Sequence, residues 1–215
     1  MVSAPAQPAS VLAVMAHPDD PELWAGGTLA LHARDAPVTL AVAEHEAARM
    51  DEAAAGAAIL GARLAVLPAP VSAAAVADLI TGLRPDVLIT HLLTDVHPGH
   101  RETAEAVLAA LPQTVIATGR PLRVYAADTY NSLTLSGPVS APVIIDITST
   151  WEQKRNALDA HAGTQPIENH FGPMADSLPA LGRAHRRPAR RGIHAHPRPG
   201  PRACDCAAVS PADRC

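Results

Sequence analysis

Two short clusters of histidine and carboxylate side chains stand out as groups that could do chemistry. The first occupies residues 16–22 (AHPDDPE) and the second residues 95–100 (DVHPGH). Two imidazoles and a carboxylate that converge on one point could hold a catalytic zinc ion, which takes three protein ligands and keeps a fourth position for water. His17 and Asp20 are three residues apart across a turn, close enough to share one ion, and His100 would complete the set.

Each of these residues also has a simpler interpretation when it is taken alone. Either histidine could be a loop residue that faces solvent, and Asp20 could cap the N-terminus of the helix expected after it. The joint pattern is harder to explain in this way, because both clusters fall where two expected strands end.

The apolar runs predict where those strands lie. Residues 11–16 (VLAVMA) and 86–90 (DVLIT) are short apolar segments of the kind found in buried parallel strands. The first cluster follows one segment directly, and the second follows the other after a short loop. Because ligands of doubly wound sheets bind beyond the carboxyl ends of the strands, we expect the two clusters to meet there.

Strand-like and helix-like segments alternate along most of the chain. This order predicts an α/β protein, a Rossmann-like three-layer sandwich whose mostly parallel sheet is covered on both faces. The further strands are expected at residues 38–43, 64–67, 122–127 and 143–147, and the helices at residues 21–35, 46–60, 72–83, 101–111 and 151–160.

Composition and charge narrow the class of protein. The 215 residues are 48% hydrophobic and 18% charged, which excludes a disordered polyelectrolyte. No run approaches the roughly 18 apolar residues needed to cross a bilayer, and the N-terminus lacks the pattern of a signal peptide. We therefore expect a soluble cytoplasmic protein without membrane insertion.

The charge is unevenly distributed between a main body and a tail. Residues 1–183 carry 10 Lys and Arg against 19 Asp and Glu, which argues against nucleic acid as a partner. Residues 184–215 carry seven Arg, five Pro and all three cysteines, Cys204, Cys206 and Cys215. We expect one domain over 1–183 and a disordered tail over 184–215, with the abrupt change of composition compatible with an altered reading frame.

The two clusters resemble a known family. The run AHPDDPEL from Ala16 and the run DxHPxH from Asp95 are similar to those of the PIG-L/LmbE-like zinc-dependent de-N-acetylases. The resemblance extends over roughly residues 9–165, with weaker agreement at Arg49, Glu52 and residues 154–165. It implies the α/β fold above and hydrolysis of an N-acyl group, acetyl in most members, from an amino sugar or its conjugate.

The resemblance also implies a role for each site residue. His17, Asp20 and His100 would be the zinc ligands, and Fe²⁺ is the alternative metal because it shares the two-histidine, one-carboxylate set. Asp19 would be the general base, and His97 would stabilise the oxyanion and share proton delivery to the leaving amine. The residues expected to contact substrate are Glu46, Arg49 and His161, with Glu44 an alternative to Glu46.

One departure from the family pattern falls inside the second motif. The family reads HPDH where this chain has Gly99 between Pro98 and His100. A carboxylate at that position would orient the neighbouring histidine, so its loss should lower the basicity of His97 and loosen its orientation. Asp95 is a candidate to replace it.

Three functions therefore follow from the sequence, in order of preference. The first is a de-N-acetylase that acts on a small N-acylated amino sugar. The second is an amidase of the mycothiol-conjugate type, which would cut a larger amide with the same metal site. The third is a degenerate metal-binding or interaction protein, for which Gly99 and the unusual tail are the arguments. Association into a homo-oligomer is left open.

Overall fold

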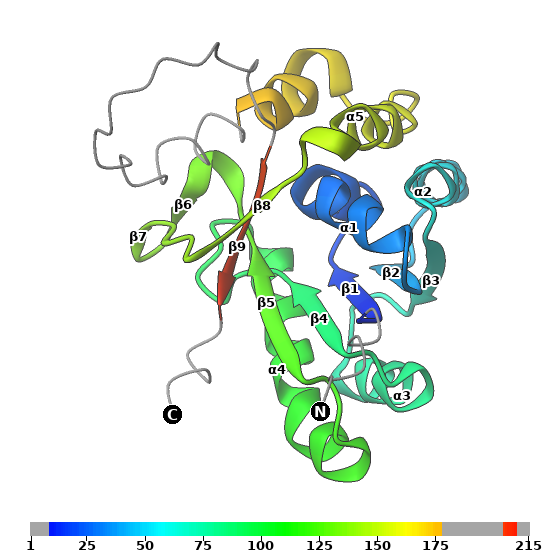
Figure 1. Ribbon diagram of the computed structural model, residues 1–215, viewed down its shortest axis with the longest axis vertical. Coiled ribbons are helices and arrows are strands. Elements are labelled where there is room, and N and C mark those ends of the chain that lie inside the picture. Colours follow the sequence, from blue (N-terminus) through cyan, green and yellow to red (C-terminus); the bar gives the residue numbers. More distant parts are fainter. Residues whose placement is uncertain (1–8, 178–203, 210–215) are drawn as a thin grey trace, which may run out of the picture.

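A seven-stranded sheet forms the middle layer of the protein, and helices cover both of its faces (Figure 1). The computed structural model describes residues 9–177 and 204–209. The strand order is β3-β2-β1-β4-β5-β9-β8, and the first five strands in that order run parallel. The strands are β1 (Val11–Met15), β2 (Val38–Ala43), β3 (Arg63–Leu67), β4 (Val87–Thr90), β5 (Arg123–Ala127), β8 (Val143–Asp146) and β9 (Cys204–Val209).

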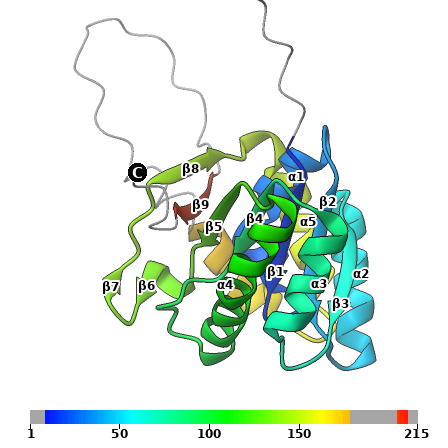
Figure 2. The same cartoon turned by 90° about the horizontal axis from the view of Figure 1, so that it is seen from below.

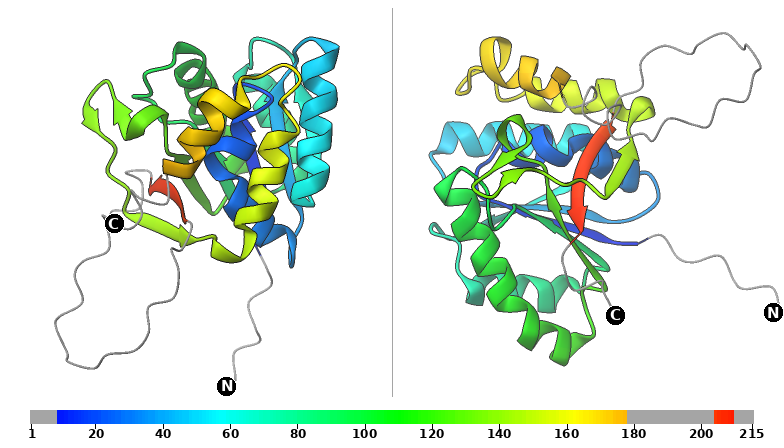
Figure 3. Two further views of the ribbon diagram at one scale, coloured as in Figure 1. Left: turned by 90° about the horizontal axis from the view of Figure 1, so that it is seen from above. Right: turned by 90° about the vertical axis from the view of Figure 1, so that its left-hand side faces the viewer.

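The helices pack in two layers, one on each face of the sheet. In the right-hand view of Figure 3, α1, α2 and α5 lie above the sheet and α3 and α4 lie below it, and Figure 2 shows α3 and α4 side by side. The helices are α1 (Gly26–Ala33), α2 (Ala47–Leu60), α3 (Ala73–Leu83), α4 (Pro98–Thr118) and α5 (Trp151–Asp159). The expected α/β Rossmann-like sandwich with a mostly parallel sheet is confirmed.

Strand β1 shows why the sheet needs cover on both sides. Its residues are all buried, and they alternate between two cores. Val11, Ala13 and Met15 belong to the core under α1, α2 and α5, whereas Leu12 and Val14 belong to the core under α3 and α4. A continuous apolar strand of this kind is stable only when both of its faces are removed from water.

Helix α4 is longer than its sequence predicts. It begins at Pro98 and continues through Pro112 to Thr118, whereas an end at Leu111 was expected. An interior proline removes one backbone donor and clashes with the preceding turn, which usually ends or kinks a helix. In this structure the helix nevertheless continues for six residues beyond Pro112.

The region between β5 and β8 holds small elements only. A 3₁₀ turn (Tyr130–Ser132) leads into the hairpin of β6 (Leu133–Thr134) and β7 (Gly137–Pro138). After β8, another 3₁₀ turn (Thr148–Thr150) precedes α5. An isolated bridge joins Thr134 to Asp95. The hairpin is thereby attached to the loop that carries the second cluster.

The tail contributes a strand that was not expected. Residues 204–209 form β9, which runs antiparallel between β5 and β8 and completes the sheet. The prediction of a tail without packed elements is wrong for these six residues, because the gap beside β5 offers backbone partners to any extended segment. The rest of 184–215, with Cys215, lies outside the described residues. No helix in the described part of the chain has the length and apolar character needed to cross a membrane.

Candidate metal centre

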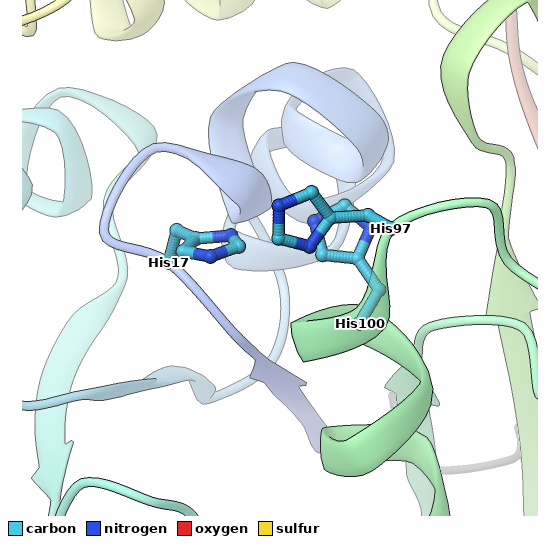
Figure 4. A group of neighbouring side chains, drawn as sticks. All are labelled: His17, His97 and His100. Atoms are coloured by element: carbon cyan, nitrogen blue, oxygen red, sulfur yellow. The ribbon is translucent and has the colours of Figure 1, made fainter.

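The two clusters meet at the carboxyl ends of β1 and β4, which are neighbours in the sheet. His17 lies just after β1, while His97 and His100 lie at the start of α4, whose N-cap is His97. Figure 4 shows the three imidazoles turned toward one another across the gap between these segments. The meeting of the two clusters at this edge was the central expectation from the sequence.

Asp20 is the carboxylate around which the histidines gather. Its side chain is 2% exposed, and its Oδ2 lies 3.0 Å from Nδ1 of His17. Its Oδ1 lies 3.3 Å from Nε2 of His100 and accepts the indole N–H of Trp24 at 3.1 Å. Burial alone would raise the pKa of Asp20, but His91 and His100 hold it well below its ordinary value.

The expected capping role of Asp20 is not observed. Asp20 does occupy the N-cap position of the π-helical turn Pro21–Ala25, but its side chain makes no capping hydrogen bond. Oδ2 accepts the backbone N–H of His17 at 2.8 Å instead, and both oxygens face the histidines. The carboxylate is therefore turned into the site, away from the helix that follows it.

Asp95 fixes the orientation of His100. Its Oδ2 lies 3.0 Å from Nδ1 of His100, and both side chains are fully buried. This contact leaves Nε2 of His100 facing Asp20 with no hydrogen-bond partner. Burial lowers the pKa of His100, but Asp20 and Asp95 outweigh it and raise that pKa to about 9. A field that favours a proton on Nε2 also favours a divalent cation that displaces it.

Asp95 does not replace the carboxylate missing at position 99. Its Oδ1 accepts the backbone N–H of His97 at 2.8 Å, and it makes no recorded bond to the His97 ring. Nδ1 of His97 is buried and has no hydrogen-bond partner among the described residues. Burial lowers the pKa of His97, and the nearby His100 and His17 lower it further.

Asp19, the expected base, lies beside Asp20 and is 4% exposed. Its Oδ1 accepts a hydrogen bond of 2.6 Å from Nη2 of Arg49 at the start of α2. Burial raises the pKa of Asp19 and the charge of Asp20 adds to this, whereas Arg49 opposes it. Asp19 and Arg49, predicted as base and substrate contact, are thus in direct contact with each other.

The other two expected substrate residues lie in very different surroundings. Glu46 is exposed and contacts His45, whose Nε2 lies 3.0 Å from Nη1 of Arg49, so it belongs to the rim of the site. His161 has no exposed surface, and its Nε2 lies 3.6 Å from Oε2 of the equally buried Glu22. A direct contact between His161 and substrate stays a prediction, since the residue is fully buried in this structure.

The sequence did not identify His91, Tyr130 and Trp24 as site residues. His91 follows β4 and is 2% exposed. Its ring stacks on that of His100 at a centroid distance of 3.8 Å, and its Nε2 lies 3.0 Å from the backbone N of Ala16. Tyr130 stacks on His100 at 5.7 Å and meets Trp24 edge to face at 5.1 Å.

Only part of this second set could have been found from sequence. His91 directly follows an expected strand, which is a signal of position. Tyr130 lies in an irregular segment in which Asn131 and Ser132 have positive φ values of 53° and 51°, and nothing in the local pattern indicates that its ring reaches the histidines. Its placement depends on the path of the chain after β5.

The residues present fit a divalent cation. Tetrahedral zinc with bonds of about 2 Å to nitrogen and oxygen places its ligand atoms about 3.3 Å apart. Oδ2 of Asp20 lies 3.0 Å from Nδ1 of His17, and Oδ1 of Asp20 lies 3.3 Å from Nε2 of His100, so each pair of atoms is close to that spacing. Two overlapping groups of side chains could hold an ion. Within each group, one ligand atom from each residue lies within 4.8 Å of the others; the groups are His17 with His97 and His100, and Asp20 with His91 and His100.

Comparison with known proteins gives one family match. Residues 12–111 match PIG-L, described as GlcNAc-PI de-N-acetylase, and this segment contains both clusters. No curated protein matches the sequence.

Several solved structures share the fold. The conserved protein TT1542 from Thermus thermophilus has a TM-score of 0.73 at 19% identity, over 94% of each chain. N,N'-diacetylchitobiose deacetylase from Pyrococcus horikoshii has a TM-score of 0.69 at 20% identity, over 97% of this chain and 88% of that one. GalB of Pseudomonas putida, a 4-carboxy-2-hydroxymuconate hydratase, has a TM-score of 0.68 at 21% identity, over 92% and 95%.

Proposed function

We propose that this protein, whose residues 12–111 match the PIG-L model, is a zinc-dependent hydrolase that removes an N-acyl group, typically acetyl, from an amino sugar or its conjugate. The observation that carries the proposal is the convergence of His17, Asp20 and His100 at the end of β1, where the buried Nε2 of His100 makes no hydrogen bond and lies 3.3 Å from Oδ1 of Asp20. The similarity of fold does not by itself select the reaction, since a hydratase shares it.

The proposed metal ligands are His17, Asp20 and His100. Zinc bound there would supply the Lewis acidity that polarises an amide carbonyl and lowers the pKa of water to about 7. Asp95 supports this role of His100, because a carboxylate on the far ring nitrogen fixes the ring and makes the free nitrogen a better donor. Fe²⁺ could occupy the same donor set.

Asp19 is the proposed general base. It adjoins a proposed ligand in sequence, and a carboxylate in that place can take the proton of the attacking water, for a rate gain of about 10²–10⁴. Arg49 favours the ionised form that a base requires. His97 is the proposed donor to the oxyanion and to the leaving amine, for which its position beside His17 is suited.

The proposed substrate is a small N-acylated amino sugar. Arg49 and the exposed Glu46 lie on the rim, where a guanidinium can bind an anionic group and a carboxylate can accept bonds from sugar hydroxyls. The Pyrococcus neighbour is named for such a substrate, N,N'-diacetylchitobiose. An amidase that cuts a larger conjugate would use the same metal and base.

The test is release of acetate from N-acetylglucosamine and N,N'-diacetylchitobiose by the zinc-loaded protein, with Asp19→Asn as the inactive control. We expect turnover by the wild type, and a loss of at least about 100-fold in the variant with its zinc content unchanged. Turnover that survives in Asp19→Asn would reject the mechanism. A wild-type protein that binds zinc but cleaves neither the sugars nor a bulky thiol conjugate would instead favour the non-catalytic interpretation.

A further inference from the structure

The three histidines of Figure 4 form a group of their own. The ring centroid of His97 lies 4.8 Å from that of His17 and 4.6 Å from that of His100. The centroids of His17 and His100 are 5.2 Å apart. One nitrogen from each ring lies within 4.8 Å of the others. His97 is thus as close to its two neighbours as they are to each other, although the proposed ligand set includes only those two.

The nitrogens of the three rings differ in what they contact. Nδ1 of His100 faces Asp95 at 3.0 Å, and Nδ1 of His17 faces Asp20 at the same distance. Nδ1 of His97 has no hydrogen-bond partner among the described residues, and it is buried. A buried polar nitrogen without a partner is costly, and the cost is removed when the nitrogen binds a proton acceptor or a cation.

Gly99 lies beside the His97 ring and offers it no side-chain partner. A Cβ at this position would lie 3.4 Å from both Nδ1 and Cε1 of His97 and 3.6 Å from Nε2 of His17, which is ordinary van der Waals contact. An acidic side chain would therefore fit beside His97 and could hold its ring. Since residue 99 is glycine and Asp95 bonds only the backbone N–H of His97, no side chain among the described residues forms a hydrogen bond with Nδ1 of this ring.

We propose that His97 is a fourth ligand of the metal in the resting site of this chain, beside His17, Asp20 and His100. The inference rests on the proposed function and changes one part of it. Four protein ligands give a closed centre, whereas a catalytic centre keeps one position for water. His97 must then leave the metal before water or substrate can enter, and only in that released state can it serve the oxyanion and the leaving amine.

The proposal predicts an unusual effect of Gly99→Asp. The new carboxylate would bind the His97 ring and compete with the metal for it, so the centre would open. We expect kcat to rise by about tenfold or more, and the affinity for zinc to fall. If the new carboxylate only damages the site, kcat and the affinity for zinc would both fall, and the proposal would be contradicted.

The first experiment counts imidazole ligands in the zinc-loaded, full-length wild type by X-ray absorption at the zinc edge. We expect three imidazoles, and two in Gly99→Asp. The second measures the zinc Kd by competition with a chelator for wild type, His97→Ala and the control His170→Ala, which removes an exposed histidine far along the chain. We expect His97→Ala to weaken binding by at least about tenfold and His170→Ala to leave it unchanged.

The outcomes separate this inference from the proposed function. Two imidazoles in the wild type, together with an unchanged Kd in His97→Ala, would overturn the inference and leave the deacetylase proposal intact. Failure of the wild type to bind zinc at all would overturn both. The absorption measurement on the wild type does not depend on any variant, so a misfolded His97→Ala protein would not leave the question open.

Discussion

Arg49 and Asp19 are joined by a hydrogen bond of 2.6 Å between Nη2 and Oδ1, which ties the first turn of α2 to the loop after β1. The Arg49 side chain is 11% exposed and that of Asp19 is 6% exposed, so the ion pair is largely shielded from water. Burial and the adjacent Asp20 raise the pKa of Asp19, and Arg49 is the group that opposes them. The guanidinium therefore favours the ionised form of the carboxylate against these two effects.

This ion pair predicts the effect of Arg49→Gln. Without the positive charge the pKa of Asp19 rises further, so a larger fraction of the base is protonated at neutral pH and kcat/KM should fall by at least about tenfold. Arg49→Lys keeps the charge and should recover part of the loss. Initial rates on the best substrate would measure both, and equal rates for Gln and wild type would contradict the coupling.

Asp95→Ala tests the orientation of His100. Removal of the buried carboxylate frees the His100 ring, and loss of such a partner typically costs about 10–100-fold in metal affinity. Chelator competition measures the Kd, and circular dichroism checks that the variant is folded. A folded Asp95→Ala protein with wild-type affinity would show that His100 needs no such support.

Gly27→Ala tests the packing of α1 against the segment before α5. A Cβ at Gly27 would lie 2.4 Å from Cδ1 and 2.7 Å from Cβ of the buried Ile147, which leaves no room for it. We expect a loss of about 1–3 kcal/mol in the free energy of unfolding by urea. Gly82→Ala is the matched control, because nothing lies within 4 Å of its Cβ and alanine is the better helix former by about 1 kcal/mol. The two variants should therefore change stability in opposite directions.

Asp86 predicts a pH dependence of stability away from the site. It accepts bonds from the backbone N and the hydroxyl of Ser10, both at 3.0 Å, and pairs with Arg120 at 3.0 Å. The bonds from Ser10 are the main cause that lowers its pKa, with Arg120 adding to them.

A lowered pKa means that the folded state favours the ionised carboxylate. The stabilisation is complete above the ordinary pKa near 3.8 and is lost as the pH falls through the lower folded value. Asp86→Asn should therefore be less stable than wild type at pH 7, and the gap should close toward pH 3. Urea unfolding at both values measures this, and a gap that stays constant with pH would assign the effect to Asn itself.

The sequence by itself determined most of the fold and the place where the two histidine and carboxylate clusters meet. The apolar runs of β1 and β4 and the alternation of strands with helices predicted a parallel sheet. A strand buried on both faces is apolar at nearly every position, and this is visible in the sequence. The two clusters then had to meet, since neighbouring parallel strands end at the same edge. His17, Asp20 and His100 were predicted as metal ligands in this way, whereas the roles of Asp19 and His97 were implied by the family resemblance and stay predictions.

Only the tertiary structure decided the contacts that come from elsewhere in the chain. The stacking of His91 and Tyr130 on His100, the burial of His161 against Glu22 and the strand β9 depend on chain paths that have no local pattern. The side on which a carboxylate points is also a tertiary property: Asp20 looks like a helix cap in sequence, but the histidines that converge on it give its charge stronger partners. The same holds for Gly99. The sequence shows that a carboxylate is missing at this position, whereas the structure shows that Nδ1 of the neighbouring His97 has no hydrogen-bond partner.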